Sequence, residues 1–526
     1  MRTDSIVIVG GGTAGWMTAA SLCNAFPNKK ISLIESADVP TVGVGESTLG
    51  HINTWLHSIG VHEDDFMKDT DASLKLSIKF TDWAGKNTGH FHYPFGFPYQ
   101  ENSKFGLFDW FVRKMKDPSI PNTDFAETYN PAVHLCDMGK VDTQSKMPNW
   151  SYKHDVAYHF DAAKFGIWLR EKYCKPRGVN HIVGTINEEV KTNDAGVEYV
   201  ELTTGEKIHA DLYIDCTGWK SLLLGKALKV PFNSYSHRLP NDSAWACRLP
   251  YTNKELELEG ATNCTALGNG WVWNIPLWSR TGTGYVYSSK YISDDAALEE
   301  FKLYLLNDRT VNGKPAIVTK ETIEALEFKK IKMRVGIHER VFHKNVAAIG
   351  LAAGFIEPLE SNGLYTVHEF LHKLIKTISR DDIGYVDRAG YNMVAINNFK
   401  AFADFVAMHY MVSQRSDTKY WRDAKEREVN LGTEYDEMYQ NVFHFHQKKF
   451  LSHTDDGGLV YIAAGLNWNP VCEYDERLSL ENPNRNREDD LVHVKFDYMD
   501  NNKKLWSNIA KDCTSLYEHI KSKHEG

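Results

Sequence analysis

Short β-branched runs alternate with a helical pattern in the first part of the chain. Residues 5–9 read S-I-V-I-V and residues 31–35 read I-S-L-I-E, and both runs are typical of buried parallel strands. Between them, residues 16–26 place apolar side chains at helical spacing. The pattern therefore predicts a strand–helix–strand unit over residues 5–35.

Farther along, the pattern changes from strands to helices. Short strands with the turn signals N-D-A-G and T-T-G-E are predicted from about residue 182 to residue 217, and another strand over residues 346–350. The polar residues 482–490 are predicted to form a surface loop. After Gly363 the apolar residues fall on two helical faces: Leu364, Val367, Phe370, Leu371, Leu374 and Ile375, and then Ile396, Phe399, Ala403, Val406 and Tyr410. These periodicities favour an α/β fold followed by a mainly helical C-terminal part.

Composition narrows the class of protein. The chain has 526 residues, of which 42% are hydrophobic, and a net charge of −9, which argues against a surface that coats nucleic acid. No stretch reaches the roughly 18 apolar residues of a membrane span, and no apolar leader precedes the first strand. The eight cysteines form no C-x-x-C pair, which is typical of a reduced protein without a cysteine-rich zinc site. We therefore expect a soluble, cytoplasmic protein without nucleic-acid or membrane partners.

A glycine-rich segment, G-G-G-T-A-G at residues 10–15, follows the first predicted strand and opens the helix. Gly10, Gly12 and Gly15 fit G-x-G-x-x-G, in which glycines let the backbone approach a pyrophosphate at the positive end of a helix. Glu35 ends the second strand, where an acidic side chain binds a ribose hydroxyl in such sites. The combination predicts a dinucleotide site for NAD or FAD, and a glycine-rich turn without a ligand is the alternative.

Two later segments favour FAD over NAD. Residues 211–219, D-L-Y-I-D-C-T-G-W, resemble the second FAD-contacting motif of flavoprotein monooxygenases. Residues 350–363, G-L-A-A-G-F-I-E-P-L-E-S-N-G, resemble their third flavin contact. A second G-x-G-x-x-G for NADPH is absent, so we expect the electrons to come from outside this chain.

Four motifs occur together: G-G-G-T-A-G-W, G-V-G-E-S-T at residues 43–48, W-V-W-N-I-P at residues 271–276, and G-F-I-E-P-L-E-S-N-G. With them the chain resembles the flavin-dependent tryptophan halogenase family. The resemblance implies a Rossmann-type FAD-binding module of the GR2, p-hydroxybenzoate hydroxylase-like monooxygenase fold.

The same resemblance implies how the chain is divided and what it does. Residues 1–375 are expected to form the FAD-binding module, with residues 88–150 on the substrate side, and residues 376–526 a mainly helical substrate-binding or lid region. A separate NAD(P)H-dependent flavin reductase supplies reduced FAD, and oxygen converts it to a flavin hydroperoxide. This oxidises chloride, bromide or iodide to a hypohalous acid, which travels through a tunnel to an electron-rich carbon of an indole-like or phenolic substrate. Family members are often homo-oligomers.

The family motifs also map onto residues that bind the cofactor and the halide. Halide binding is expected at the backbone N–H groups of Asn362 and Gly363, at the positive end of the helix that follows. The family usually has threonine where this chain has Asn362, so the halide preference is open, and an ordinary polar N-cap is the alternative. Cofactor contacts are expected from Gly10, Gly12, Thr13, Ala14, Gly15, Glu35, Gly45, Glu46, Ser47, Gly350 and Ile356.

A lysine and a carboxylate carry the chemistry in the family. The segment S-L-K-L-S-I-K-F offers two lysines. The motif assigns the role to Lys75, and Lys79 is the second choice because alternate residues of one strand share a face. Glu360, the second acid of E-P-L-E-S, is expected to polarise the oxidant or to accept the proton that the ring loses. Glu357, the first acid, is expected to be structural. Without the motif, the lysine and Glu360 would be interpreted as a solvated charge and a buried, backbone-bonded carboxylate.

Aromatic residues are expected to shape the substrate side. Trp271 and Trp273 share one face of a predicted strand and are expected to separate the flavin from the organic substrate, with a core role as the alternative. Tyr93 and Phe95 lie in G-H-F-H-Y-P-F-G, which resembles the family segment that sandwiches an indole, and Trp468 is a third candidate. Tyr93 stands where the tryptophan enzymes usually have histidine. An indole, a phenol or a larger aromatic compound is therefore at least as compatible as free tryptophan.

The sequence also contains H-E-F-L-H, a literal zinc motif formed by His368, Glu369 and His372 on a predicted helix. It makes a zinc metallohydrolase the remote alternative, but the next glutamate after Glu369 is Glu426, too far for the usual third ligand, so helix packing is preferred and no metal site is predicted. A single-component FAD aromatic hydroxylase, which oxidises NAD(P)H itself, is the closer alternative. An FAD-binding protein without turnover is the third, against which the presence of Lys75 and Glu360 counts.

Overall fold

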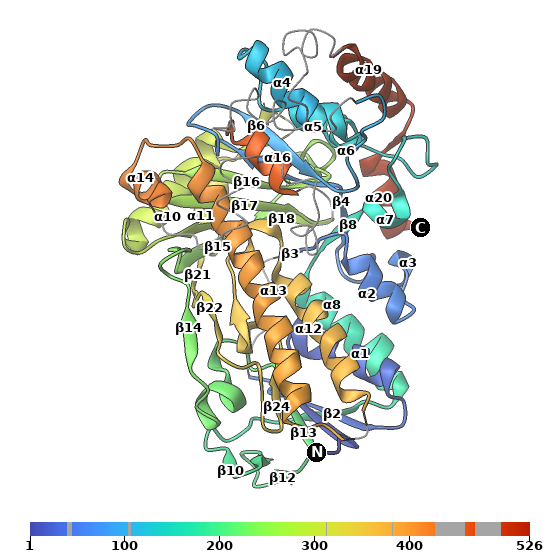
Figure 1. The fold of residues 1–526 in the computed structure, drawn as a ribbon, viewed down its shortest axis with the longest axis vertical. Coiled ribbons are helices and arrows are strands. Elements are labelled where there is room, and N and C mark those ends of the chain that lie inside the picture. The colour runs from blue at the N-terminus through green and yellow to red at the C-terminus, as the bar shows by residue number, and fades with distance from the viewer. Residues whose placement is uncertain (39–44, 104–106, 312, 381, 427–457, 469–495) are drawn as a thin grey trace, which may run out of the picture.

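The computed structural model describes residues 1–38, 45–103, 107–311, 313–380, 382–426, 458–468 and 496–526. Gly43 and Val44 of the second motif and the predicted loop at residues 482–490 lie outside the described residues. The molecule is elongated, with one sheet toward each end and the long helix α13 (Tyr385–Val412) running between them (Figure 1).

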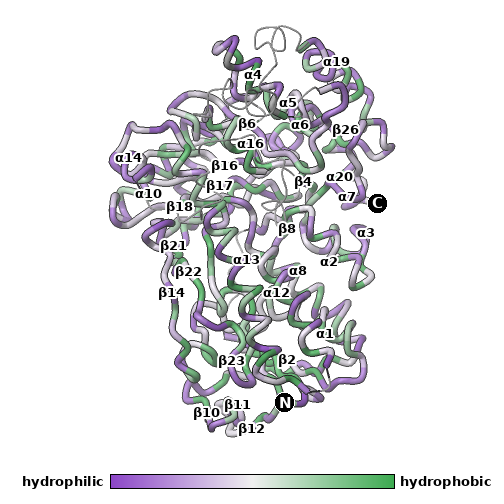
Figure 2. The backbone as a smooth tube through the Cα atoms, viewed as in Figure 1, coloured by the Kyte–Doolittle hydropathy of each residue, from purple (hydrophilic) through white to green (hydrophobic). Residues whose placement is uncertain are grey.

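A six-stranded sheet forms the end that contains the first strand, in the order β23–β24–β13–β1–β2–β9. All neighbouring pairs are parallel except the edge pair β23–β24. The strands are β1 (Ser5–Val9), β2 (Lys30–Glu35), β9 (Asn180–Val183), β13 (Leu212–Asp215), β23 (Phe342–His343) and β24 (Val346–Ala348). Helix α1 (Thr13–Ala25) joins β1 to β2 and is mostly buried, so the predicted strand–helix–strand unit is confirmed. The strands around β2 are mostly green in Figure 2, as expected for a sheet covered on both faces.

A seven-stranded sheet forms the other half, in the order β21–β15–β18–β17–β16–β5–β6. Its pairs are antiparallel except β16–β5. The strands are β5 (Ser77–Thr81), β6 (His90–Pro94), β15 (Ser243–Pro250), β16 (Ala261–Leu267), β17 (Gly270–Pro276), β18 (Arg280–Tyr287) and β21 (Lys329–Lys332). The W-V-W-N-I-P box makes up all of β17 except its first residue, so its prediction as a strand is confirmed.

The segment that carries Lys75 and Lys79, predicted as one strand, forms two strands that pair with different neighbours. Strand β4 (Ser73–Lys75) pairs with β8 (Ala157–Phe160), which also pairs with β3 (Glu46–Ser47), whereas β5 belongs to the large sheet. At Leu76 the backbone N–H donates to the carbonyl of Gly260, and the chain passes from one sheet into the other. The segment is therefore not one strand with a single face, and the expectation that Lys75 and Lys79 belong to one strand is wrong.

Helices make up most of the described C-terminal part, as the sequence predicts. They are α12 (Gly363–Ile378), α13, α14 (Lys419–Lys425), α16 (Gly458–Gly465), α19 (Asp497–Lys511) and α20 (Leu516–Glu525). A short strand, β26 (Thr514–Ser515), pairs with β7 (Lys140–Val141) and ties this part to the middle of the sequence. The predicted boundary at residue 375 lies inside α12, and the division of the chain there stays a prediction.

The remaining elements cover the two sheets. The helices are α2 (Ile52–Ser58), α3 (Glu63–Phe66), α4 (Phe108–Lys116), α5 (Asp124–Tyr129), α6 (Ala132–Asp137), α7 (Tyr152–Asp155), α8 (Ala162–Trp168), α9 (Lys254–Glu257), α10 (Asp294–Leu303) and α11 (Lys320–Ala325). The strands are β10 (Lys191–Asn193), β11 (Gly196–Glu201), β12 (Lys207–Ile208), β14 (Phe232–Ser234), β19 (Thr310–Val311), β20 (Lys314–Pro315), β22 (Gly336–His338) and β25 (Gly354–Phe355). Across the described ranges, none of the helices combines the length and the apolarity that a membrane span requires.

Candidate active site

The glycine-rich loop between β1 and α1 is shaped by close backbone packing. Gly10 has a φ of +114°, and a Cβ there would lie 2.2 Å from the carbonyl oxygen of Cys216. A Cβ on Gly15 would lie 1.9 Å from the carbonyl oxygen of Gly10, whereas one on Gly12 would meet nothing within 4 Å. Gly12 thus leaves an open approach to the start of α1, which is the shape that a dinucleotide pyrophosphate needs. The loop fits FAD.

Glu35 lies beside this loop and is held there by two partners that sequence reasoning missed. Arg170 donates from Nη1 to its Oε1 at 2.8 Å, and His181 Nε2 lies 2.7 Å from the same oxygen. Trp16 donates to Oε2 over a longer 3.4 Å. A Cβ on Gly11 would lie 1.7 Å from Oε2, so the carboxylate is directly against the loop. The position suits a ribose contact.

The other predicted cofactor residues divide into two groups. A Cβ on Gly350 would lie 2.9 Å from the Cβ of Ala14, so the third motif packs on the first one. Thr13 donates its hydroxyl to the carbonyl of Ala162, and Ile356 is buried. The second group, Gly45, Glu46 and Ser47, lies instead on the side of Lys75 and the start of α12.

Lys75 is fully buried at the end of β4. Its Nζ donates to the hydroxyl of Ser361 at 2.7 Å and to the carbonyl of Thr48 at 2.8 Å. It also lies 5.0 Å from the centre of the Phe95 ring, within reach of a cation–π contact. Burial lowers the pKa of Lys75 to about 7, although the neighbouring Glu360 favours the ammonium form. Near neutral pH this amine is therefore present in both protonation states.

Lys79, the second lysine of the segment, has a different environment. It forms a buried ion pair with Glu259 on the large sheet. A lysine held by a carboxylate in this way is already neutralised. The two candidates thus have different surroundings, and Lys75 contacts Ser361 of the E-P-L-E-S motif.

Ser361, which sequence reasoning missed, links Lys75 to a buried chain of hydroxyl groups. Its Oγ lies 3.0 Å from Ser47 Oγ, which lies 2.6 Å from Thr262 Oγ1. Thr262 Oγ1 is in turn 2.8 Å from His159 Nε2. Ser361 has a φ of +56°, a left-handed conformation that turns the chain into α12. Ser361 stands between Glu360 and Asn362 in the E-P-L-E-S-N-G segment, and this motif was the local signal that could have identified it.

The start of α12 faces a second titratable group. A Cβ on Gly363 would lie 2.8 Å from Glu46 Oε1. Desolvation raises the pKa of Glu46 to about 7, against the effect of the Lys75 charge. The side chain of Asn362 does not cap the helix, so the interpretation of Asn362 as an ordinary N-cap is not supported. Its Oδ1 is buried without a hydrogen-bond partner among the described residues.

Glu360 is buried and shares a proton with His409 of α13. His409 Nε2 lies 2.6 Å from Glu360 Oε1, and its Nδ1 lies 2.9 Å from the carbonyl of Phe405. A carbonyl only accepts, so Nδ1 carries a hydrogen, and the short contact at Nε2 then requires a second proton between the ring and the carboxyl. Glu360 Oε2 has no hydrogen-bond partner among the described residues. One oxygen is therefore anchored and the other is available for a ligand.

A pocket of about 250 Å³ lies next to Glu360. Tyr93 and Phe95, two of the residues proposed for the substrate side, line it, whereas Trp468 does not. Tyr93 also stacks on Tyr461 of α16, with ring centres 6.1 Å apart. The full lining is Leu49, Gly50, His51, Asn53, Thr54, His57, Tyr93, Phe95, Gly96, Phe97, His154, Asp155, Glu360, Phe402 and Phe405.

The two indoles of β17 are buried side by side, with ring centres 6.3 Å apart. Trp271 donates from Nε1 to Glu357 Oε2 at 3.1 Å, and Tyr410 donates to the same oxygen at 2.8 Å. Glu357 therefore has the structural environment that the sequence predicted for it. A Cβ on Gly284 would lie 2.3 Å from the Trp273 ring, so the neighbouring strand makes room for this side chain.

The H-E-F-L-H motif lies on α12 as predicted. His368 is buried against Tyr365, and burial lowers its pKa to about 3. Glu369 forms an ion pair with Lys373 at 2.8 Å, and His372 is exposed. Within the described part of the chain, no third ligand joins these residues in a metal-binding group. The contacts support the interpretation as helix packing.

Comparisons of the sequence and of the structure with known proteins agree on one family. The family model described as tryptophan halogenase matches residues 5–472. Tryptophan 6-halogenase SttH of Streptomyces toxytricini is 36% identical, over 81% of this chain and 82% of its own. The solved apo structure of VirX1 is 33% identical with a TM-score of 0.87, and covers 99% of both chains. Xcc4156, a flavin-dependent halogenase from Xanthomonas campestris, is 26% identical with a TM-score of 0.82, and also covers 99% of both chains.

Proposed function

The chain belongs to the tryptophan halogenase family, and from this premise we propose that it halogenates an electron-rich aromatic compound with Lys75 and Glu360 as its catalytic residues. The resemblance expected from the sequence and the FAD-binding Rossmann-type fold are confirmed. The protein is a flavin-dependent halogenase, an oxidoreductase of a family that works with a separate flavin reductase. Its cytoplasmic location remains a prediction.

The proposal rests on two buried groups, the amine of Lys75 and the Oε2 atom of Glu360. Reduced FAD, when bound, supplies the electrons with which oxygen oxidises a halide ion to hypohalous acid. The Lys75 ammonium group offers hydrogen-bond donors to the oxygen of that acid and makes its halogen more electrophilic. Glu360 Oε2 lies at the pocket and accepts the proton that the aromatic carbon loses when the halogen is added.

The halide is proposed to bind at the backbone N–H groups of Asn362 and Gly363. A helix N-terminus attracts anions, and the uncapped start of α12 supports this role. Glu46 lies against the same turn, and because burial raises its pKa to about 7, it repels an anion there less at and below neutral pH than an ordinary carboxylate would. Trp271 and Trp273 are proposed to keep the organic substrate away from the flavin, which is supported by their rigid burial on a central strand.

The substrate is proposed to be an indole-like or phenolic compound. The pocket of about 250 Å³ has Tyr93 and Phe95 as aromatic walls, which suits one or two fused rings. Trp468 is a further proposed contact, although it does not line the pocket.

The proposed activity is tested by supplying reduced FAD from an unrelated flavin reductase. Oxygen, one halide at a time and a panel of indoles and phenols are added, with catalase to remove leaked peroxide, and products are measured by mass spectrometry. We expect halogenated product that requires both the reductase and the halide. Hydroxylated product without halide would contradict the proposal in favour of an aromatic hydroxylase. The panel includes a phenol at high concentration. It reacts with any oxidised halide, so halide oxidation is detected even if the natural substrate is not in the panel.

The pH dependence of halogenation is expected to change when Glu46 is replaced by glutamine. The Glu46 carboxylate favours the ammonium form of Lys75, so its removal lowers the pKa of Lys75 below its value of about 7. If the ammonium form is the active one, kcat falls as pH rises through that pKa, and Glu46→Gln moves this fall to lower pH. Profiles of kcat across neutral pH at saturating substrate check the shift. The exposed Glu339→Gln serves as the control, and a shift to higher pH in Glu46→Gln would contradict the assignment.

A further inference from the structure

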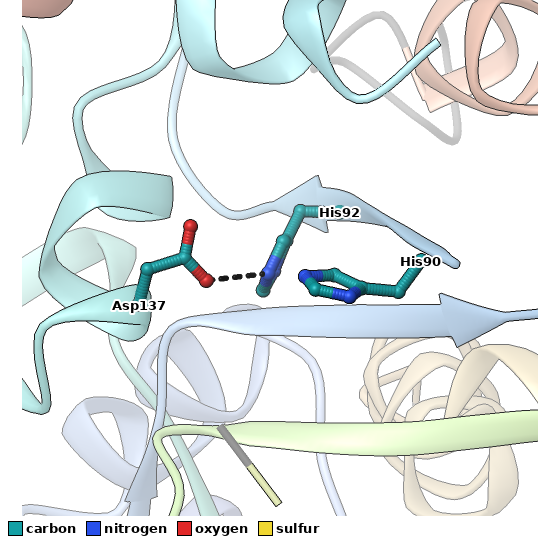
Figure 3. Close-up of side chains that lie close together, drawn as sticks. All are labelled: His90, His92 and Asp137. Atoms are coloured by element: carbon teal, nitrogen blue, oxygen red, sulfur yellow. Dashed lines mark ion pairs between the residues drawn. The ribbon is translucent and has the colours of Figure 1, made fainter. Parts of the chain in front are cut away.

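Two histidines and an aspartate come together on the side of β6 that faces α6. His90 and His92 are alternate residues of β6 and share one face of the strand, and Asp137 ends α6. One ligand atom from each of the three side chains lies within 4.8 Å of the other two. Figure 3 shows both imidazoles and the carboxylate directed toward one another.

His92 is oriented as a metal ligand would be. Its Nδ1 lies 2.9 Å from the hydroxyl of Ser77, which donates to the carbonyl of Tyr93 at 3.0 Å or to that of Ile78 at 3.1 Å. The hydroxyl proton of Ser77 is thus directed to a carbonyl, and Ser77 Oγ accepts the hydrogen carried by His92 Nδ1. A second polar group that fixes one ring nitrogen while the other faces the ion is typical of metal-bound histidine.

The other ring nitrogen of His92, Nε2, faces a carboxylate oxygen, although a neutral ring with its hydrogen on Nδ1 has only a lone pair to offer at Nε2. In the neutral tautomer, Nε2 has a lone pair, and it lies 3.3 Å from Asp137 Oδ1. Nε2 is buried without a hydrogen-bond partner among the described residues, and His92 is only 4% exposed. Two acceptors at this separation require a positive charge between them or a proton on the ring.

We propose that His90, His92 and Asp137 bind a divalent transition-metal ion, for which Zn²⁺ is the reference. With ligand distances of about 2.0–2.1 Å, the edge of a tetrahedral zinc site is about 3.3 Å long, which matches the separation of His92 Nε2 and Asp137 Oδ1. His90 supplies the third ligand, and water completes the coordination. The nearby Lys79 is paired with Glu259, which offsets part of its charge.

The proposed ion has a structural role near the substrate pocket. It joins β6 to α6, and the same strand carries Tyr93, on its other face, to the pocket lining. Neither histidine nor the aspartate lines that pocket or contacts Lys75 or Glu360. The inference is therefore independent of the proposed halogenation, and either one can fail without the other.

The test is metal binding by the full-length protein, freed of any affinity tag and treated with a chelator. Calorimetric titration with Zn²⁺ measures stoichiometry and affinity, and thermal unfolding with and without Zn²⁺ measures the linked stabilisation. We expect one Zn²⁺ per chain at this site and a rise in Tm. Asp137→Asn and His90→Gln should each weaken binding by about 10-fold or more and remove the rise. Mg²⁺ should have no effect, because a site with two imidazoles favours softer ions.

His209→Ala is the matched control, because this histidine is exposed and belongs to none of the three. It should bind Zn²⁺ like the unchanged protein. Since Asp137→Asn also removes a partner of His92, each variant is judged by its own change on adding Zn²⁺, not by its absolute Tm. Equal Zn²⁺ affinity in all variants, or no stoichiometric binding in the unchanged protein, would overturn the proposal and leave a proton-bridged His92–Asp137 pair.

Discussion

Lys75→Met is expected to lower the rate of halogenation by about 10²- to 10³-fold, the usual effect of removing one preorganised hydrogen-bond donor from an active site. Methionine keeps the length of the side chain but offers no hydrogen-bond donor to the oxidant. The variant should remain folded, because the lowered pKa of Lys75 means that its charged form is disfavoured in the folded state. The measurement is kcat with reduced FAD, halide and an accepted aromatic substrate, together with the Tm.

Lys79→Met is the control for this prediction. It removes the lysine of a buried ion pair with Glu259, a kind of change that costs about 3–5 kcal/mol of stability, so we expect a lower Tm. Below that Tm, its halogenation rate per folded molecule should be close to that of the unchanged protein. The assignment is wrong if Lys79→Met is inactive while folded and Lys75→Met is active.

Glu360→Gln is expected to lower kcat by about 10²-fold, because an amide does not accept the proton of the halogenated ring. The amide keeps the volume and retains a hydrogen-bond contact to His409, so KM should change little. Loss of the ring proton should become the slow step. A substrate with deuterium at the reacting carbon should therefore show a primary isotope effect in the variant that is absent from the unchanged protein.

His409→Phe separates the role of the carboxyl from that of its partner. His409 anchors Glu360 Oε1 but does not line the pocket, so it acts as a positioning residue. Its loss should lower kcat less than Glu360→Gln does, since the carboxyl group that accepts the ring proton is kept and only its anchor is removed. If Glu360→Gln shows no isotope effect and instead slows oxidation of the halide, Glu360 acts on the oxidant and not on the ring.

The sequence by itself determined the parts that depend on neighbouring residues. The β-branched runs and Gly10, Gly12 and Gly15 indicate the strand–loop–helix unit, because hydrophobic periodicity and the spacing of a glycine motif are local properties. The motif around Glu360 and the indoles of β17 indicated the family for the same reason, since each motif is continuous along the chain.

Only the tertiary structure decided which of these groups meet. Nothing in the sequence connects Lys75 to Ser361, or Glu360 to His409, because 286 and 49 residues separate the partners. Lys75 and Lys79 have different surroundings because the chain changes sheet at Leu76, and this change follows from the pairing of distant strands. The histidines of β6 were visible as H-F-H, but Asp137 was not. Local patterns fix backbone conformation, whereas a site also requires burial and long-range pairing, and these exist only in the folded chain.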